Sequence, residues 1–108
     1  MTEEKKILFV GTFSAGKTTL VDALVGRKVL SGKGTSEITC VYNEDAFVTP
    51  PVIDNCDRYV GVKLSSNISK LPICFIDTPG WDDIHVLERL IKRNQINTIL
   101  FVINSSHL

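Results

Sequence analysis

The sequence predicts an α/β fold in which a mostly parallel sheet carries helices on both of its faces. Three short runs, Ile7–Val10, Ile73–Ile76 and Ile99–Ile103, are apolar throughout instead of alternating with polar residues. Strands have this composition when both faces of the sheet are covered, as they are in parallel sheets. Two helical patterns lie between these runs, and the order strand, helix, strand, helix, strand is typical of right-handed crossover connections.

The first helical pattern begins near Lys17, and Gly26 is placed as its C-terminal cap. Its apolar face consists of Leu20, Val21, Leu24 and Val25. The second pattern covers roughly Ile84 to Arg93. Its apolar residues at helical spacing are Ile84, Leu87, Leu90 and Ile91. We expect these two faces to cover opposite sides of the sheet.

The middle of the chain gives a weaker pattern. Ser31–Thr39 is small, polar and glycine-containing, which indicates a mobile loop. The stretches "CVYNEDAFV" and "RYVGVKL" are compatible with two further strands. They are joined through Pro50–Pro51, where regular strand structure is not expected.

Length and composition favour one globular domain, residues 1–108, with 44% apolar residues to form a core. Twelve acidic and twelve basic residues cancel, which argues against a nucleic-acid-coating protein. No apolar run approaches a bilayer span, and the polar amino terminus shows no signal peptide. Three cysteines without CxxC spacing favour neither a disulfide framework nor a zinc site, and Cys74 is expected to be a buried reduced thiol. These features predict a cytoplasmic protein.

The stretch "GTFSAGKTT" follows the first apolar run and leads into the first helix. Its pattern, Gly11-x-x-x-x-Gly16-Lys17-Thr18, is that of a P-loop, in which glycines let backbone N–H groups approach a polyphosphate closely. The lysine can reach the outer phosphates, and the Thr18 hydroxyl can bind Mg²⁺. By chance the pattern arises in on the order of a few chains per thousand of this length. The predicted nucleotide-binding residues here are Gly11, Ser14, Ala15, Gly16, Lys17, Thr18 and Thr19, with an ordinary polar role in the loop as the alternative for Ser14.

A second informative stretch is "ICFIDTPGWDD", a buried strand that ends in Asp77. A carboxylate at that place can face the Mg²⁺ side of the phosphates, and Gly80 can offer a backbone N–H to a γ-phosphate. Taken together, these two stretches resemble the P-loop GTPases: "GTFSAGKT" is similar to their G1 motif and "DTPG" to their G3 motif. The resemblance implies a three-layer P-loop NTPase fold and binding of GTP and GDP with Mg²⁺.

Within that superfamily, "FSAGKTTLVDALVGRKVL" is similar to the corresponding pattern of dynamin-like GTPases and mitofusins, and Era-type and septin-like GTPases share parts of it. The family places a G2 threonine in its first switch, closing over Mg²⁺ and the γ-phosphate. Thr35 and Thr39 are the two candidates, and we favour Thr39 because it precedes the apolar "CVY". An ordinary threonine at the start of a strand remains the alternative for Thr39. The resemblance thus implies Thr18, Thr39 and Asp77 as metal ligands.

Catalysis is expected to be slow, with Lys17 and Thr39 as the catalytic residues implied by the resemblance. Many Ras-like enzymes have a glutamine just after Asp-x-x-Gly to orient water, whereas this chain has Trp81. Dynamin-like and Era-like proteins also carry apolar residues there, so the departure fits them. The same resemblance implies homodimerisation through the nucleotide face as a way of raising the rate.

The chain reaches "FVINSSHL" without an Asn/Thr-Lys-x-Asp motif, with which P-loop GTPases recognise guanine. We therefore expect residues 1–108 to be the N-terminal part of a longer G domain, truncated before the guanine-specificity strand. Any membrane contact would come from regions outside it. Two alternatives stay open: a P-loop ATPase or nucleotide kinase, and a non-catalytic interaction module with a vestigial nucleotide site.

Overall fold

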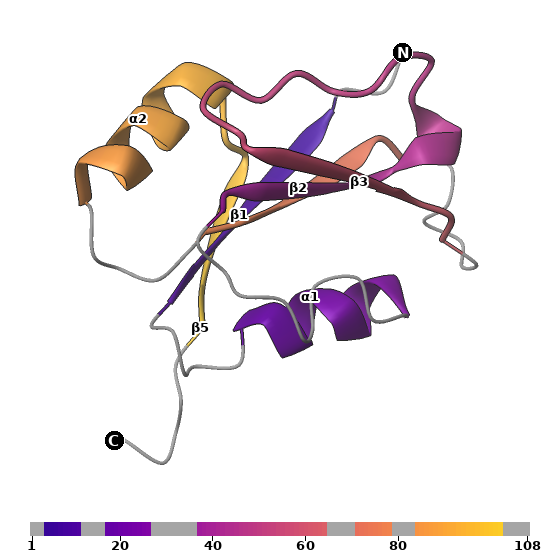
Figure 1. Ribbon diagram of the computed structural model, residues 1–108, viewed down its shortest axis with the longest axis horizontal. Helices are drawn as coiled ribbons and strands as arrows, with labels where there is room; N and C mark the ends of the chain where they lie inside the picture. The colour runs from indigo at the N-terminus through magenta and orange to yellow at the C-terminus, as the bar shows by residue number, and fades with distance from the viewer. Residues whose placement is uncertain (1–3, 12–16, 27–36, 65–70, 79–83, 103–108) are drawn as a thin grey trace.

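The computed structural model describes residues 4–11, 17–26, 37–64, 71–78 and 84–102. Two α-helices, five strands and one turn of 3₁₀ helix, η1, are found in these ranges (Figure 1). In chain order they are β1 (Lys5–Gly11), α1 (Lys17–Val25), β2 (Thr39–Asn43), η1 (Glu44–Ala46), β3 (Arg58–Val62), β4 (Ile73–Asp77), α2 (Ile84–Asn94) and β5 (Thr98–Val102). The predicted order of elements is confirmed.

The five strands form one mixed sheet in the order β3-β2-β4-β1-β5. β1 pairs in parallel with both β4 and β5, whereas β2 runs antiparallel to β4 and parallel to β3. The three strands predicted from apolar runs are therefore the mutually parallel ones. The sheet belongs to the α/β class that the sequence predicts, with β2 and β3 as a reversed pair at one side.

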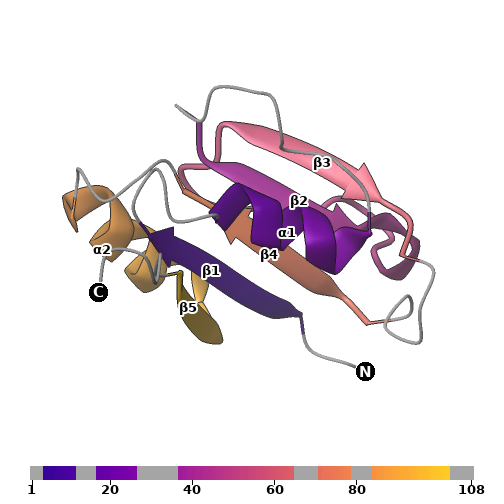
Figure 2. The same ribbon diagram turned by 90° about the horizontal axis from the view of Figure 1, so that it is seen from below.

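Helices α1 and α2 cover opposite faces of this sheet, which gives three layers (Figures 1 and 2). Alternate residues of each central strand separate into two cores, as strand geometry requires. The core under α1 contains Phe9, Val21, Val25, Val41, Val62, Leu64 and Phe75. The core under α2 contains Leu8, Val10, Ile38, Cys40, Ile53, Cys74, Ile76, Leu87 and Leu90.

Each helix buries a narrower face than its apolar pattern predicts. In α1, Val21 and Val25 are buried, while Leu24 is 45% exposed. In α2, Leu87 and Leu90 are buried, while Ile84 is 68% exposed. The predicted cap of the first helix is confirmed: Gly26 has a φ of +80° and donates its N–H to the carbonyl of Asp22 at 2.9 Å.

Strand β5 differs from the prediction that its apolar residues are covered on both faces. Ile99, Leu100 and Phe101 are 36%, 38% and 61% exposed. The physical reason is its place at the edge of the described sheet, because the core under α2 contains side chains of β1, β2 and β4 and none of β5. Its start is fixed to β1 by Asn97, whose Oδ1 accepts from the N–H of Lys6 at 2.6 Å.

The middle of the chain forms the two further strands that the sequence allows, but the first is shorter than "CVYNEDAFV". It ends at Asn43 and continues as η1. Pro50–Pro51 lies in the irregular connection to β3, as predicted. Gly61 of β3 packs closely against two side-chain ends, because a Cβ there would lie 2.8 Å from the Glu44 carboxylate and 3.0 Å from the Tyr42 hydroxyl oxygen, so a larger residue would displace them.

All three cysteines are free thiols, and Cys74 is buried as predicted. Cys40 and Cys74 lie on the same side of neighbouring strands. A hydrogen bond with Cys74, and then burial, raises the pKa of the Cys40 thiol. Within the described ranges, no helix combines the length and apolar character needed to cross a membrane.

Candidate nucleotide-binding site

Four of the predicted site residues meet at one end of the strands, where β1 and β4 end and β2 begins: Gly11, Lys17, Thr39 and Asp77. Gly11 is the last residue of β1 and Asp77 the last of β4, and these two strands are parallel neighbours with Phe9 opposite Asp77. β2 runs in the opposite direction, so its first residue, Thr39, stands opposite Asp77 on the other side of β4. Directly opposed residues of an antiparallel pair share a face, with Cβ atoms about 5 Å apart. The register thus places Thr39 beside Asp77.

Lys17, the first residue of α1, contacts the same carboxylate. Its Nζ lies 3.6 Å from Oδ1 of Asp77, and their side chains are only 3% and 2% exposed. A buried lysine is rare unless it is paired, because removing its charge from water is costly. Lys17 therefore places its ammonium group at the tip of β4, where the sequence predicts the phosphates of a nucleotide.

The electrostatic balance at Asp77 is dominated by burial. Burial raises the pKa of the Asp77 carboxyl, Lys17 opposes that change, and the nearby Asp22 carboxylate adds to it. Asp22 is itself 7% exposed. Among the described residues, the buried charges at this end of the sheet are thus the two acids Asp22 and Asp77 and the lysine Lys17.

Asp77 fits the role of a ligand for a hard cation such as Mg²⁺. Its Oδ1 is buried and accepts no hydrogen bond from the described residues, although Lys17 lies nearby. Carboxylate oxygens are preferred Mg²⁺ ligands, and Mg²⁺ in nucleotide sites is usually held by one or two protein oxygens together with phosphates and water. The described residues contain no group of three His, Cys, Asp or Glu side chains that could hold a metal by themselves. Asp77 and Thr39 would supply protein oxygens, and a nucleotide would complete the site.

The sequence did not predict that Thr78 fixes the tip of β4. Its Oγ1 donates to the carbonyl of Phe9 at 2.9 Å, and its side chain is 1% exposed. This bond joins β4 to β1 one residue beyond Asp77 and limits where the carboxylate can lie. Asp22 was also missed, although an acid inside the apolar run "LVDALV" is a visible signal for a buried charge.

The remaining predicted site residues are only partly described. Thr19 lies on α1 with an exposed side chain, and Thr18 lies in the same helix. Several predicted residues fall outside the described ranges: Ser14, Ala15, Gly16, Thr35, Gly80 and Trp81. The structure therefore brings together Gly11, Lys17, Thr39 and Asp77, and the roles of the others stay predictions.

A three-layer α/β fold with a lysine at the start of the first helix and an aspartate at the tip of the adjacent strand defines a P-loop NTPase. The profile of a family described as 50S ribosome-binding GTPase matches residues 6–108. The chain belongs to this family of GTPases. Family membership supports guanine-nucleotide binding in general terms and confirms the resemblance found in the two motifs.

A similar solved structure is a chain of an oligomerised bacterial dynamin pair, a pair described as providing a mechanism for the long range sensing and tethering of membranes. The two chains are 19% identical, with a TM-score of 0.54, over 92% of this chain and 20% of that one. At this identity the likeness shows the fold alone. The chain spans about a fifth of the length of the solved chain. No curated protein matches the sequence.

Proposed function

We propose that the protein binds GTP with Mg²⁺ at the edge formed by Gly11, Lys17, Thr39 and Asp77, and hydrolyses it slowly. The observation that carries this proposal is the buried pair of Lys17 and Asp77, 3.6 Å apart, at the corner where β1 leads toward α1. A buried ion pair is weak evidence for stability, because desolvation opposes its attraction. Its place at a strand-to-helix corner with a P-loop sequence favours a functional role.

In the proposed complex, the Lys17 ammonium leaves Asp77 and contacts the outer phosphates. Asp77 would then be able to hold Mg²⁺, which would neutralise phosphate charge. Thr39 offers its hydroxyl beside the same carboxylate, at the position of the switch threonine in the resemblance. The Lys17 charge, which is paired with Asp77 in the nucleotide-free site, is then paired with phosphate, and the strands need no large rearrangement.

Binding is tested with a fluorescent GTP analogue, displaced by GTP or by ATP, with and without Mg²⁺. We expect GTP to compete at least about tenfold better than ATP, and Lys17→Ala to abolish binding. The matched control is Lys92→Ala, which removes the same charge far from the site. Lys92 is an exposed lysine of α2 paired with Glu88. Equal competition by ATP would favour an ATPase or nucleotide kinase. Absence of Mg²⁺-dependent binding would favour the vestigial module.

Hydrolysis is tested with single-turnover phosphate release from bound GTP. We expect Thr39→Ala to lower the rate by at least about tenfold, equivalent to about 1.4 kcal/mol of transition-state stabilisation. Thr39→Ser keeps the hydroxyl and is expected to retain most of the rate. Equal rates for Thr39→Ala and the unchanged protein would contradict the role of Thr39 while leaving GTP binding intact.

Self-association through the nucleotide face and a cytoplasmic location are further parts of the proposal. The solved bacterial dynamin is described as oligomerised, which supports testing self-association. Sedimentation velocity with GDP and with a non-hydrolysable GTP analogue measures it directly. A single monomeric species in both nucleotide states would contradict that part alone.

A further inference from the structure

A short stretch ahead of β3, residues 53–58, is bonded to the residue that precedes Thr39; we name it the clasp segment. The Asp57 carboxylate accepts from the N–H of Ile38 at 2.9 Å. The N–H groups of Asp57 and Arg58 donate to the carbonyl of Ile38 at 2.9 and 3.1 Å. Both backbone polar groups of Ile38 are therefore held by the clasp segment, and this fixes the start of β2.

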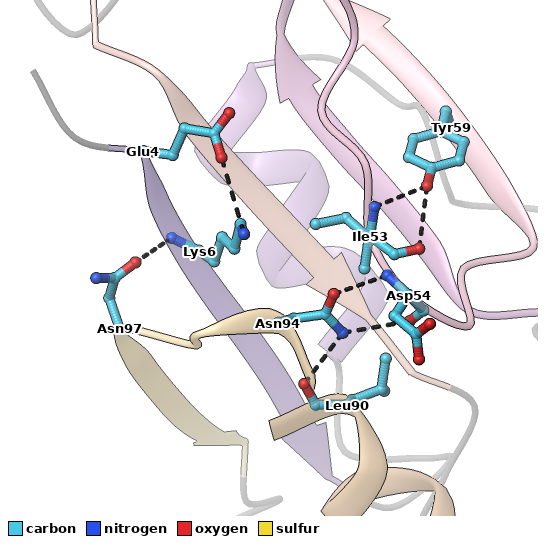
Figure 3. Close-up of polar contacts among 8 residues, drawn as sticks. All are labelled: Glu4, Lys6, Ile53, Asp54, Tyr59, Leu90, Asn94 and Asn97. Atoms are coloured by element: carbon cyan, nitrogen blue, oxygen red, sulfur yellow. Dashed lines mark hydrogen bonds and ion pairs between the residues drawn. The ribbon is translucent and has the colours of Figure 1, made fainter. Parts of the chain in front are cut away.

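The other side of the clasp segment is bonded to the last residue of α2. The Asn94 side chain accepts from the N–H of Asp54 at 2.7 Å and donates to the Asp54 carbonyl at 3.2 Å (Figure 3). It also donates to the carbonyl of Leu90, one turn earlier in α2, at 3.0 Å. The Asn94 side chain is 3% exposed, so these bonds are protected from water. The Asn94 side-chain amide thus joins α2 to the clasp segment by pairing with both the N–H and the carbonyl of Asp54.

Bonds within the clasp segment, and between it and Tyr59, the residue that follows it, fix its shape. The Tyr59 hydroxyl accepts from the N–H of Ile53 at 2.9 Å and donates to the Ile53 carbonyl at 3.1 Å (Figure 3). Cys56 donates its N–H to the same carbonyl at 3.3 Å, which closes a turn, and Asn55 adopts a φ of 69° within it. The Ile53 side chain is buried in the core under α2. These bonds link the Asp54 side of the segment, next to α2, with its Asp57 side, next to β2.

We propose that the clasp segment couples the C-terminal end of α2 to the start of β2, with Asn94 as the positioning residue. This inference rests on the proposed function, in which Thr39 serves the nucleotide and α2 follows the Asp77 motif. When α2 moves, Asn94 moves the backbone of Asp54 with it. The Asp57 carboxylate, bonded to the N–H of Ile38, then displaces Ile38, the residue before Thr39. Thr39 at the start of β2 and the Asp77 motif that precedes α2 then respond together to the ligand. Contiguous hydrogen bonds of this kind are a physical route for such coupling, which only perturbation can demonstrate.

The first test uses residue-resolved amide hydrogen exchange of the nucleotide-free protein. In Asn94→Ala we expect the N–H groups of Asp54 and Ile38 to exchange at least about tenfold faster, while those of β1 stay unchanged. Asn94→Asp retains the acceptor for Asp54 but places a buried carboxylate against the carbonyls of Asp54 and Leu90, so it is expected to accelerate exchange at both N–H groups at least as much. The reverse test, which leaves Asn94 in place, decides the question if neither variant folds. Acceleration at Asp54 with unchanged exchange at Ile38 overturns the proposal.

Coupling must also operate in reverse, because linkage between two sites is reciprocal. Asp57→Asn weakens the bond to Ile38, and we expect it to accelerate exchange of the Asp54 N–H that Asn94 holds. Asp45→Asn is the matched control, since Asp45 is an exposed acid of η1 outside the clasp segment. Equal exchange at Asp54 in Asp57→Asn and in the control overturns the proposal.

A nucleotide arm separates this inference from the proposed function. In the unchanged protein, GTP analogue with Mg²⁺ is expected to slow exchange of both Ile38 and Asp54, and in Asn94→Asp the effect at Asp54 is expected to be lost. If nucleotide does not bind at all, the proposed function fails while the nucleotide-free comparison still decides the coupling. If nucleotide binds and protects Ile38 while Asp54 is unaffected in the unchanged protein, the proposal is overturned and GTP binding stands.

Discussion

Neutralising Lys17 and Asp77 together is expected to cost the nucleotide-free protein less stability than the two single replacements predict. Their charged atoms are 3.6 Å apart, which gives an attraction of about 4.6 kcal/mol at an effective dielectric constant of about 20. Desolvation opposes this attraction, since burial is the largest cause acting on the pKa of Asp77 and raises it. Removing one partner of such a pair leaves an uncompensated buried charge and costs about 3–5 kcal/mol. Removing both leaves no buried charge at the pair.

The assay is a double-mutant cycle with Lys17→Met and Asp77→Asn, measured by urea unfolding without nucleotide. We expect each single variant to lose about 3 kcal/mol and the double variant to lose about as much as one single variant. The coupling energy is then about 3 kcal/mol. The control cycle uses Lys92 and Glu88, an exposed pair at 2.7 Å, for which screening by water makes the coupling far smaller. Single effects at Lys17 and Asp77 that add to within about 0.5 kcal/mol would refute the reasoning.

Three further predictions concern the same edge of the sheet and the clasp segment. Because burial raises the pKa of Asp77 above its ordinary 3.8, its proton stabilises the folded state below that value, and this stability is lost as pH rises through the folded pKa. The stability of the unchanged protein relative to Asp77→Asn should therefore fall as the pH rises above 3.8, as followed by thermal unfolding. Thr78→Val removes the bond to the Phe9 carbonyl and is expected to cost about 1 kcal/mol in urea unfolding. Tyr59→Phe removes both bonds to Ile53 and is expected to cost about 1–2 kcal/mol in the same assay.

Each of these has a specific contrary result. A stability difference between the unchanged protein and Asp77→Asn that rises with pH would mean that attraction to Lys17 outweighs burial. Valine keeps the shape of threonine and loses only the hydroxyl, so an unchanged free energy of unfolding in Thr78→Val would show that the bond to Phe9 does not hold the tip of β4. A loss below about 0.3 kcal/mol in Tyr59→Phe would show that the hydroxyl does not hold the turn ahead of β3.

The parallel part of the fold was predictable from the sequence because its signals are local. An unbroken apolar run such as Ile73–Ile76 specifies a strand covered on both faces, and Cys74, Phe75 and Ile76 are indeed buried. The glycine and lysine pattern beginning at Gly11 requires a strand before it and a helix after it, and both are present. Here periodicity and motif agree, so neither depends on knowledge of distant contacts.

Solvent exposure in β5 was not predictable from the same kind of run. Ile99 and Phe101 belong to a stretch as apolar as β4, yet they are exposed because coverage depends on which strand each helix crosses. The limits of the helical faces have the same origin: Ile84 continues the spacing of Leu87 but lies beyond the part of α2 that contacts the sheet. Periodicity identifies a face and does not say how much of it finds a partner.

The clasp segment shows why polar contacts were the hardest part to predict. Asn94 at the end of an amphipathic helix has the composition of an ordinary C-terminal residue, and "VIDNCD" has that of an ordinary turn. Their bonding depends on the backbone of Asp54 coming within 2.7 Å of a side chain forty residues away in sequence. No local property of either stretch carries that information.

The choice between Thr35 and Thr39 illustrates how the sheet adds information to a motif. In the sequence, Thr39 was favoured only because an apolar stretch follows it. The direction of β2 supplies an independent reason: because it runs antiparallel to β4, its first residue rather than its last lies at the end of β4 that carries Asp77. Had β2 been parallel to β4, its start would lie at the opposite edge, and Thr39 could not reach the cation that Asp77 is proposed to bind. The role of Thr39 therefore depends on strand direction as much as on residue type.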